Sequence, residues 1–155
     1  MRAVPDSHML DPMNINRVWV LRLALGLCLV LTALSGLVIG WLAVAFQLFG
    51  ESADAEDYDV AAGAYAASAV VLVLGAFVAR GSRAPRWQPV WALGWAAVLV
   101  VLTLSSVSEA SAMLDRGPGI NGWKDGVGGA LACPWTWPLV LLGLYEPLRR
   151  RPVTE

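Results

Sequence analysis

Few side chains within the long apolar stretches of this sequence could take part in chemistry, and they fall mainly in two of the stretches. Ser105 and Glu109 are four residues apart near the end of one stretch, so they share a face if it is helical. An acidic side chain inside a lipid-embedded helix usually lies on an ion or proton path. We expect Glu109 to sit at the solvated outer boundary; if it faces neighbouring helices instead, it would contribute to a polar pocket. The other residues of that pocket would be Tyr65, Trp135, Thr136 and Trp137.

The second unusual stretch runs from Cys133 to Pro138 and reads Cys-Pro-Trp-Thr-Trp-Pro. Pro134 and Pro138 each remove a backbone donor and release the carbonyl four residues earlier. In lipid, such released groups need a partner or a cavity. We predict that these two prolines kink a continuous helix. The alternative is a locally unwound helix, which transporters use to build substrate sites.

Small residues recur at every fourth position in two of the apolar stretches. Gly36 and Gly40 form a literal GxxxG, and Gly63 and Ala67 repeat the spacing in the next stretch. This spacing places small side chains on one face, where another helix backbone can approach closely. We predict that the two stripes pack on each other within one bundle. The alternative is that one stripe faces outward and docks a partner.

No motif predicts a metal site, a bound cofactor or an enzyme active site. The only histidine is His8, which excludes His-ligated haem and His-based metal sites inside the apolar stretches. Residues 117–122 fit GxGxxG formally, but that fingerprint must link a strand to a helix, and we interpret these residues as a flexible turn. We interpret the acidic residues between 51 and 59 as a solvated loop. Cys28 and Cys133 lie at different predicted depths and should not form a disulfide.

The composition requires a solvent other than water. Apolar residues make up 57% and charged residues 15% of the 155 residues, whereas roughly a quarter of a soluble domain is charged. A chain this short cannot hide so much apolar surface from water. Lipid is therefore the predicted solvent. The net charge of −1 gives no indication of a nucleic-acid partner.

Four stretches are long and apolar enough to cross a bilayer as helices, since a core of about 30 Å needs roughly 20 residues. None alternates with the period of two that a membrane β-strand requires. We therefore predict an all-α integral membrane four-helix bundle over residues 17–148, with a disordered cytoplasmic lead (1–16) and a basic tail (149–155). The predicted spans are approximately residues 22–49, 60–79, 90–109 and 127–146.

The basic residues predict that the N and C termini are both cytoplasmic. Nine of the eleven Lys and Arg residues lie before the first span, between the second and third, or after the fourth. Cytoplasmic segments carry such an excess. The predicted location is the inner (plasma) membrane of a bacterial cell. A secretory signal cleaved at Ala43-Val44-Ala45 is the alternative for the first span, but the preceding apolar run is longer than a signal requires.

Three functions follow from these features. The first is a non-enzymatic accessory or assembly component of a membrane complex, contacting lipid and other membrane proteins or a second copy. The second is a small transporter or ion-permeation subunit, which would act as an oligomer because four helices hardly enclose a wide pore. The third is a membrane-embedded enzyme that uses Glu109 or Cys133. We favour the first, because small-residue stripes are present and an active-site motif is not.

Overall fold

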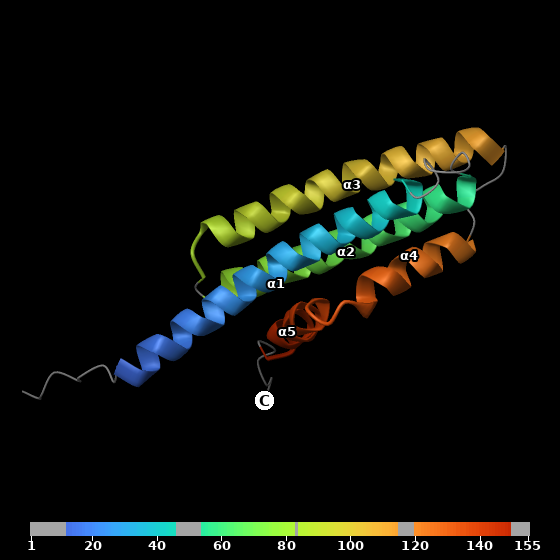
Figure 1. The fold of residues 1–155 in the computed structure, drawn as a ribbon. Helices are drawn as coiled ribbons and strands as arrows, with labels where there is room; N and C mark the ends of the chain where they lie inside the picture. Colours follow the sequence, from blue (N-terminus) through green and yellow to red (C-terminus); the bar gives the residue numbers. More distant parts are fainter. Residues whose placement is uncertain (1–11, 46–53, 83, 115–119, 150–155) are drawn as a thin grey trace, which may run out of the picture.

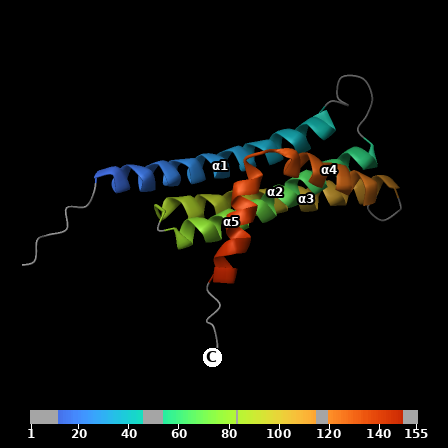
Figure 2. The same ribbon diagram turned by 90° about the horizontal axis from the view of Figure 1, so that it is seen from below.

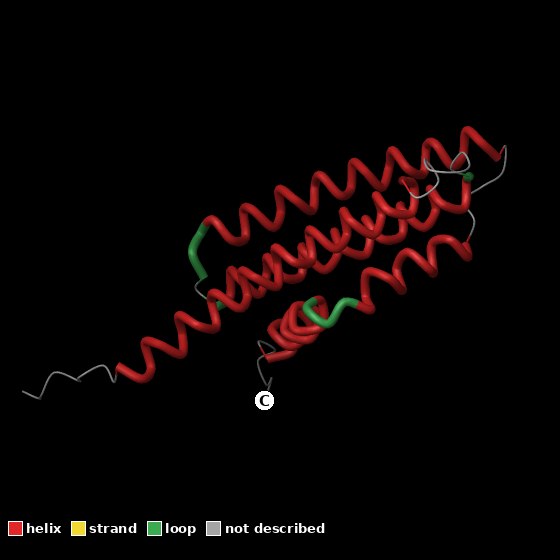
Figure 3. The backbone as a smooth tube through the Cα atoms, viewed as in Figure 1, coloured by secondary structure: helices red, strands yellow, loops and turns green. Residues whose placement is uncertain are grey.

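The computed structural model describes residues 12–45, 54–82, 84–114 and 120–149, which form five α-helices (Figures 1 and 3). No β-strand occurs within these ranges. The remaining residues, including 1–11 of the predicted lead and 150–155 of the predicted tail, lie outside them. The helices in chain order are α1 (Pro12–Ala45), α2 (Ala55–Gly81), α3 (Trp87–Leu114), α4 (Ile120–Ala132) and α5 (Thr136–Arg149).

Helices α1, α2 and α3 each contain a stretch of 27 residues that is long and apolar enough to cross a membrane. They run along one axis and alternate in direction (Figure 1). At about 1.5 Å per residue each stretch is about 40 Å long, which exceeds a hydrocarbon core of about 30 Å. Helices α4 and α5 qualify only as a pair, bent by 90°. The predicted all-α membrane bundle is confirmed, and the chain is a multi-pass membrane protein.

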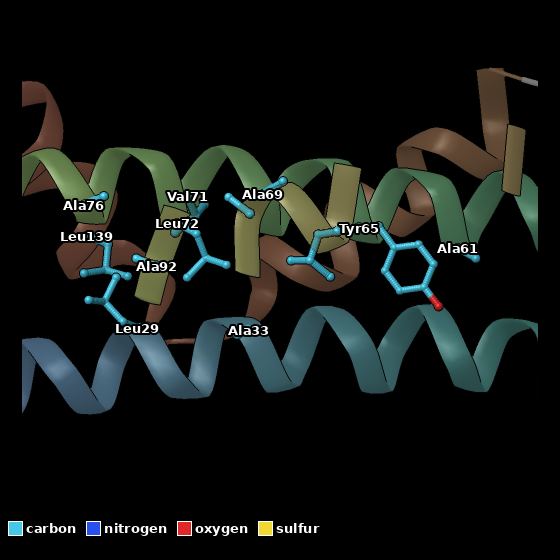
Figure 4. Close-up of a cluster of buried hydrophobic side chains, with 12 residues drawn as sticks. Leu29, Ala33, Ala61, Tyr65, Ala69, Val71, Leu72, Ala76, Ala92 and Leu139 are labelled. Atoms are coloured by element: carbon cyan, nitrogen blue, oxygen red, sulfur yellow. The ribbon is translucent and has the colours of Figure 1, made fainter. Parts of the chain in front are cut away.

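Helix α2 is the centre of this bundle. The most apolar window of α2 is 61% buried, against 28% for α1 and 22% for α3. It contacts all four other helices, whereas α3 contacts only α1 and α2 among the described residues. Lipid tails are as apolar as leucine, so this core stabilises the bundle mainly by close packing. Fully buried leucines from four helices belong to this core: Leu29, Leu72, Leu99 and Leu139. Figure 4 shows Leu29, Leu72 and Leu139 pointing into it.

The helices extend beyond the predicted spans at their polar ends. Helix α1 begins at Pro12, within the segment predicted to be disordered, and α4 begins at Ile120 rather than near residue 127. Hydropathy detects only the residues in hydrocarbon, whereas helical hydrogen bonding continues into the interface. The turn predicted at 117–122 is corrected in part, because residues 120–122 begin α4. Residues 115–119 lie outside the described ranges.

The acidic segment is also corrected, because residues 55–59 form the start of α2 rather than a loop. The Asp54 carboxylate accepts hydrogen bonds from the backbone N–H groups of Glu56 at 2.9 Å and Asp57 at 3.1 Å. The Asp57 carboxylate accepts one from the Asp54 N–H at 3.0 Å, which completes a capping box. Asp59 is only 1% exposed. The carboxylates of Asp54 and Asp57 therefore cap the N-terminus of the central helix. Residues 51–53 lie outside the described ranges.

Replacing the capping side chain should weaken the fold measurably. Asp54→Ala removes the acceptor for two backbone N–H groups, and we expect a loss of about 1 kcal/mol in the free energy of unfolding. Asp54→Ser retains an oxygen acceptor and should recover most of that loss. Unfolding of the purified protein in mixed SDS micelles, followed by circular dichroism, measures both. Equal destabilisation by Ala and Ser would contradict the capping role.

Candidate functional site

The predicted GxxxG of α1 faces into the bundle. A Cβ atom at Gly36 would lie 2.5 Å from the Ser68 hydroxyl oxygen, and one at Gly40 would overlap the ring of Tyr65. Both glycines are buried against α2. The α1 stripe is therefore used within the chain, where it brings the α1 backbone close to two polar side chains of α2.

The second predicted stripe does not face the first. A Cβ atom at Gly63 would lie 2.5 Å from the backbone carbonyl oxygen of Trp123, which belongs to α4. Ala67, one turn further along α2, is half-buried. The structure thus places α2 between two partners, with α1 on one side and α4 on the other. Four-residue spacing shows that a helix has a face of small side chains, but it does not show which neighbouring helix packs on that face.

Helix α4 carries a packing motif that the sequence analysis missed. Gly122 and Gly126 form a second GxxxG, and a Cβ atom at Gly122 would lie 2.9 Å from the Glu56 carbonyl oxygen. A Cβ atom at Gly126 would overlap the Val60 carbonyl oxygen and lie 2.8 Å from the Ala64 nitrogen. The spacing was present in the sequence, but residues 117–122 had been interpreted as a turn. Backbone lies against backbone here, so no side chain can move aside.

The fourth segment is broken at Cys133–Trp135 rather than kinked. Helix α4 ends before Pro134, and Pro138 falls in the first turn of α5, where a missing N–H costs no helical hydrogen bond. Helix α5 then crosses below α2 almost at right angles to α4 (Figure 2). Pro134 therefore lies in the break and Pro138 at a helix end, and the bend of 90° falls at Cys133–Trp135.

The polar groups at the break are bonded within the chain. The Thr136 N–H and hydroxyl both donate to the Cys133 carbonyl oxygen, at 3.1 Å and 2.6 Å. The Trp135 indole N–H donates to the Ser35 hydroxyl at 3.4 Å, and that hydroxyl donates to the Thr32 carbonyl at 3.0 Å. These bonds supply the partners that a broken helix requires inside a membrane.

The predicted polar pocket is not assembled. Glu109 and Ser105 are exposed on α3, which contacts neither α4 nor α5 among the described residues. Tyr65 is buried against Gly40 instead. Trp135 and Thr136 are engaged at the break, and Trp137 is 50% exposed. Helix α2 lies between α3 and the α4–α5 pair, so Ser105 and Glu109 do not meet the polar side chains of the break (Figure 1).

Comparison with known proteins adds no function to this description. No family model, curated protein or solved structure matches the chain. Within the described ranges, no three His, Cys, Asp or Glu side chains are grouped so as to hold a metal ion. The class that the fold defines is therefore the multi-pass α-helical membrane protein. The features that distinguish this member are the broken segment and the glycine contacts around α2.

The α2–α4 contact yields a matched pair of substitutions. Gly126→Ala places a methyl group against the α2 backbone, and we expect a loss of about 1–3 kcal/mol in the free energy of unfolding. Gly128→Ala, two residues along the same helix, meets nothing within 4 Å and should be neutral or slightly stabilising. Unfolding in SDS micelles compares the two variants. The packing assignment fails if both lose the same stability.

Proposed function

We propose that this chain is a non-enzymatic accessory component of a membrane complex and that it joins the complex through the exposed side of α3. The observation that supports this is the low burial of α3: only 22% of its most apolar stretch is buried within the chain. Its buried residues, such as Ala92, Ala96 and Leu99, face the rest of the bundle. The opposite side of α3 has no neighbour among the described residues.

The exposed side of α3 has the composition of a helix–helix contact. Its residues recur at intervals of three and four, so they form one stripe, and all are exposed: Gly94, Ala97, Val101, Ser105 and Ser108. A Cβ atom at Gly94 would meet nothing within 4 Å. Small side chains allow a second helix to approach, and serine hydroxyls can bond across such a contact.

Helix α1 provides the contrast. Most of its exposed side chains are large and apolar, including Leu23, Leu27, Leu34, Val38 and Trp41. Such residues suit contact with lipid tails, while its glycines are already used against α2. The small stripe of α3, by contrast, makes no contact with another described helix. Its partner would be a helix of another membrane protein or of a second copy.

The break in the fourth segment does not favour transport. Its indole and hydroxyl groups bond to Ser35 and Cys133, so they are not directed at a passing solute. Glu109, which could act in an ion path, lies on the exposed side of α3 rather than near the break. We therefore put forward the accessory function alone.

The proposal includes the orientation of the chain in the inner membrane. Arg80 and Arg86 lie at the end of the bundle where α2 meets α3, and Asp54, Asp57 and Glu109 lie at the other end (Figure 1). This separation supports an arrangement with the arginine end cytoplasmic. Green fluorescent protein fused to either terminus should fluoresce, and alkaline phosphatase at the same positions should stay inactive. Active phosphatase at one terminus would contradict this orientation.

A photo-cross-linking amino acid tests the contact face in living cells. At Ala97 or Val101 it should give a discrete protein adduct, because the α3 stripe meets a partner helix. At Leu34 or Val38, on the lipid-facing side of α1, the same residue should give none. Adduct mass separates a second copy from a different protein. Equal adducts from both helices, or none from α3, would remove the proposed contact face.

A further inference from the structure

A cavity of about 780 Å³ lies where the C-terminal end of α2 meets the N-terminal end of α3. Its floor is apolar and includes Phe77, Val90 and Leu93. Two arginines complete the lining, Arg80 from the last turn of α2 and Arg86 from the segment before α3. Both arginines are exposed. The cavity therefore combines a cationic side with an apolar floor.

The two arginines have no anionic partner within the described part of the chain. Each described carboxylate side chain lies toward the opposite end of the bundle, on the first turns of α2, late in α3 or early in α4. No ion pair involving Arg80 or Arg86 occurs among the described residues. A guanidinium group is planar and can hold a phosphate with two parallel hydrogen bonds. The cavity thus has the chemistry to bind a phosphate supplied from outside the chain.

The same two helices form a second hollow nearer to their middle. This hollow of about 340 Å³ is lined by α2 and α3, including Val70, Val73 and Val100. On α2, residues 70, 73, 77 and 80 recur at intervals of three and four, so both hollows open on one face. We call this apolar line, from Phe77 to Val70 on α2 and from Val90 to Leu104 on α3, the α2–α3 seam.

The length of the seam fits one leaflet. From Arg80 to Val70 the helix rises about 15 Å, at about 1.5 Å per residue. Half of a hydrocarbon core of about 30 Å is also about 15 Å. Arg80 directly follows the apolar part of α2, so its side chain lies at the depth of the lipid headgroups. A phosphate at the arginines and an acyl chain in the seam would each meet the surface that suits it.

We propose that the α2–α3 seam is a binding site for an anionic phospholipid, such as phosphatidylglycerol. Its phosphate pairs with Arg80 and Arg86, and one acyl chain lies along the seam toward Val70. Basic pockets between membrane helices on the cytoplasmic side bind anionic headgroups in this way. On α3 the seam borders the small stripe, since Val90 lies four residues before Gly94 and Leu93 four residues before Ala97. The lipid contacts do not require a partner helix, so the site does not depend on the proposed function.

Native mass spectrometry of the full-length protein tests the site. The protein is released from nanodiscs that contain dioleoyl phosphatidylglycerol and dioleoyl phosphatidylcholine in equal amounts. We expect retained phosphatidylglycerol adducts, weakened about tenfold or more by Arg80→Gln/Arg86→Gln, since each arginine near the surface attracts anionic lipid. Arg150→Gln/Arg151→Gln removes the same charge from the tail and should keep the adducts. Equal loss in both double variants, or equal retention of both lipids, overturns the proposal.

A second pair of variants tests the acyl-chain part of the site and does not depend on the arginines. Val90→Trp should fill the cavity and displace the lipid, whereas Val98→Trp is on a side of α3 that does not line it. Both positions are exposed, at 70% and 46%, so a larger side chain leaves the core intact. Inorganic phosphate at millimolar concentration should not displace the lipid. Displacement by phosphate alone, or equal adducts in the two tryptophan variants, overturns a phospholipid site.

Discussion

The close approach of the α2 backbone to α4 is the contact on which the rest of this structure depends. Gly63, Gly122 and Gly126 bring main-chain atoms of the two helices into contact, with no side chains between them. In lipid, helices gain nothing from removing apolar surface from solvent, so association rests on close packing and polar contacts. Glycine allows the shortest separation, and the number of atom pairs in dispersion contact rises accordingly. This contact fixes α4 beside the N-terminal half of α2.

The position of α4 determines what can follow it. Helix α4 ends at Ala132, and its 13 residues are only about 20 Å long, less than a hydrocarbon core of about 30 Å. The chain therefore breaks at a depth where no water is present to satisfy its backbone. The Thr136 hydroxyl donates to the Cys133 carbonyl oxygen, and the Ser35 hydroxyl accepts from the Trp135 indole N–H. Helix α5 then crosses α2, where Gly143 lies against Leu74. The broken segment is thus stabilised by two hydroxyl side chains and by one more close helix contact.

The spans could be predicted from the sequence because hydrocarbon thickness sets a minimum length that four apolar stretches meet. The bend of the fourth segment and the arrangement of side chains around Glu109 could not be predicted from the sequence, for physical reasons. Proline at 134 and 138 shows that regular hydrogen bonding is interrupted, but the bend of 90° depends on tertiary contacts of Trp135 and Leu139. The prediction of a pocket around Glu109 was wrong, because helical spacing places residues on one face of a helix but does not give the order of the helices around α2.

The same order of helices leaves α3 as the most accessible element. Its N-terminal end is fixed by Gln88, which is 3% exposed and donates to the Arg22 carbonyl oxygen of α1 at 3.2 Å. Gly26 makes room for that amide, since a Cβ atom there would lie 2.9 Å from it. Beyond this point α3 contacts mainly α2. One side of α3 is therefore held firmly, and its other sides are available to lipid and to a partner helix. A helix fixed in this way can present those surfaces without rearranging the bundle.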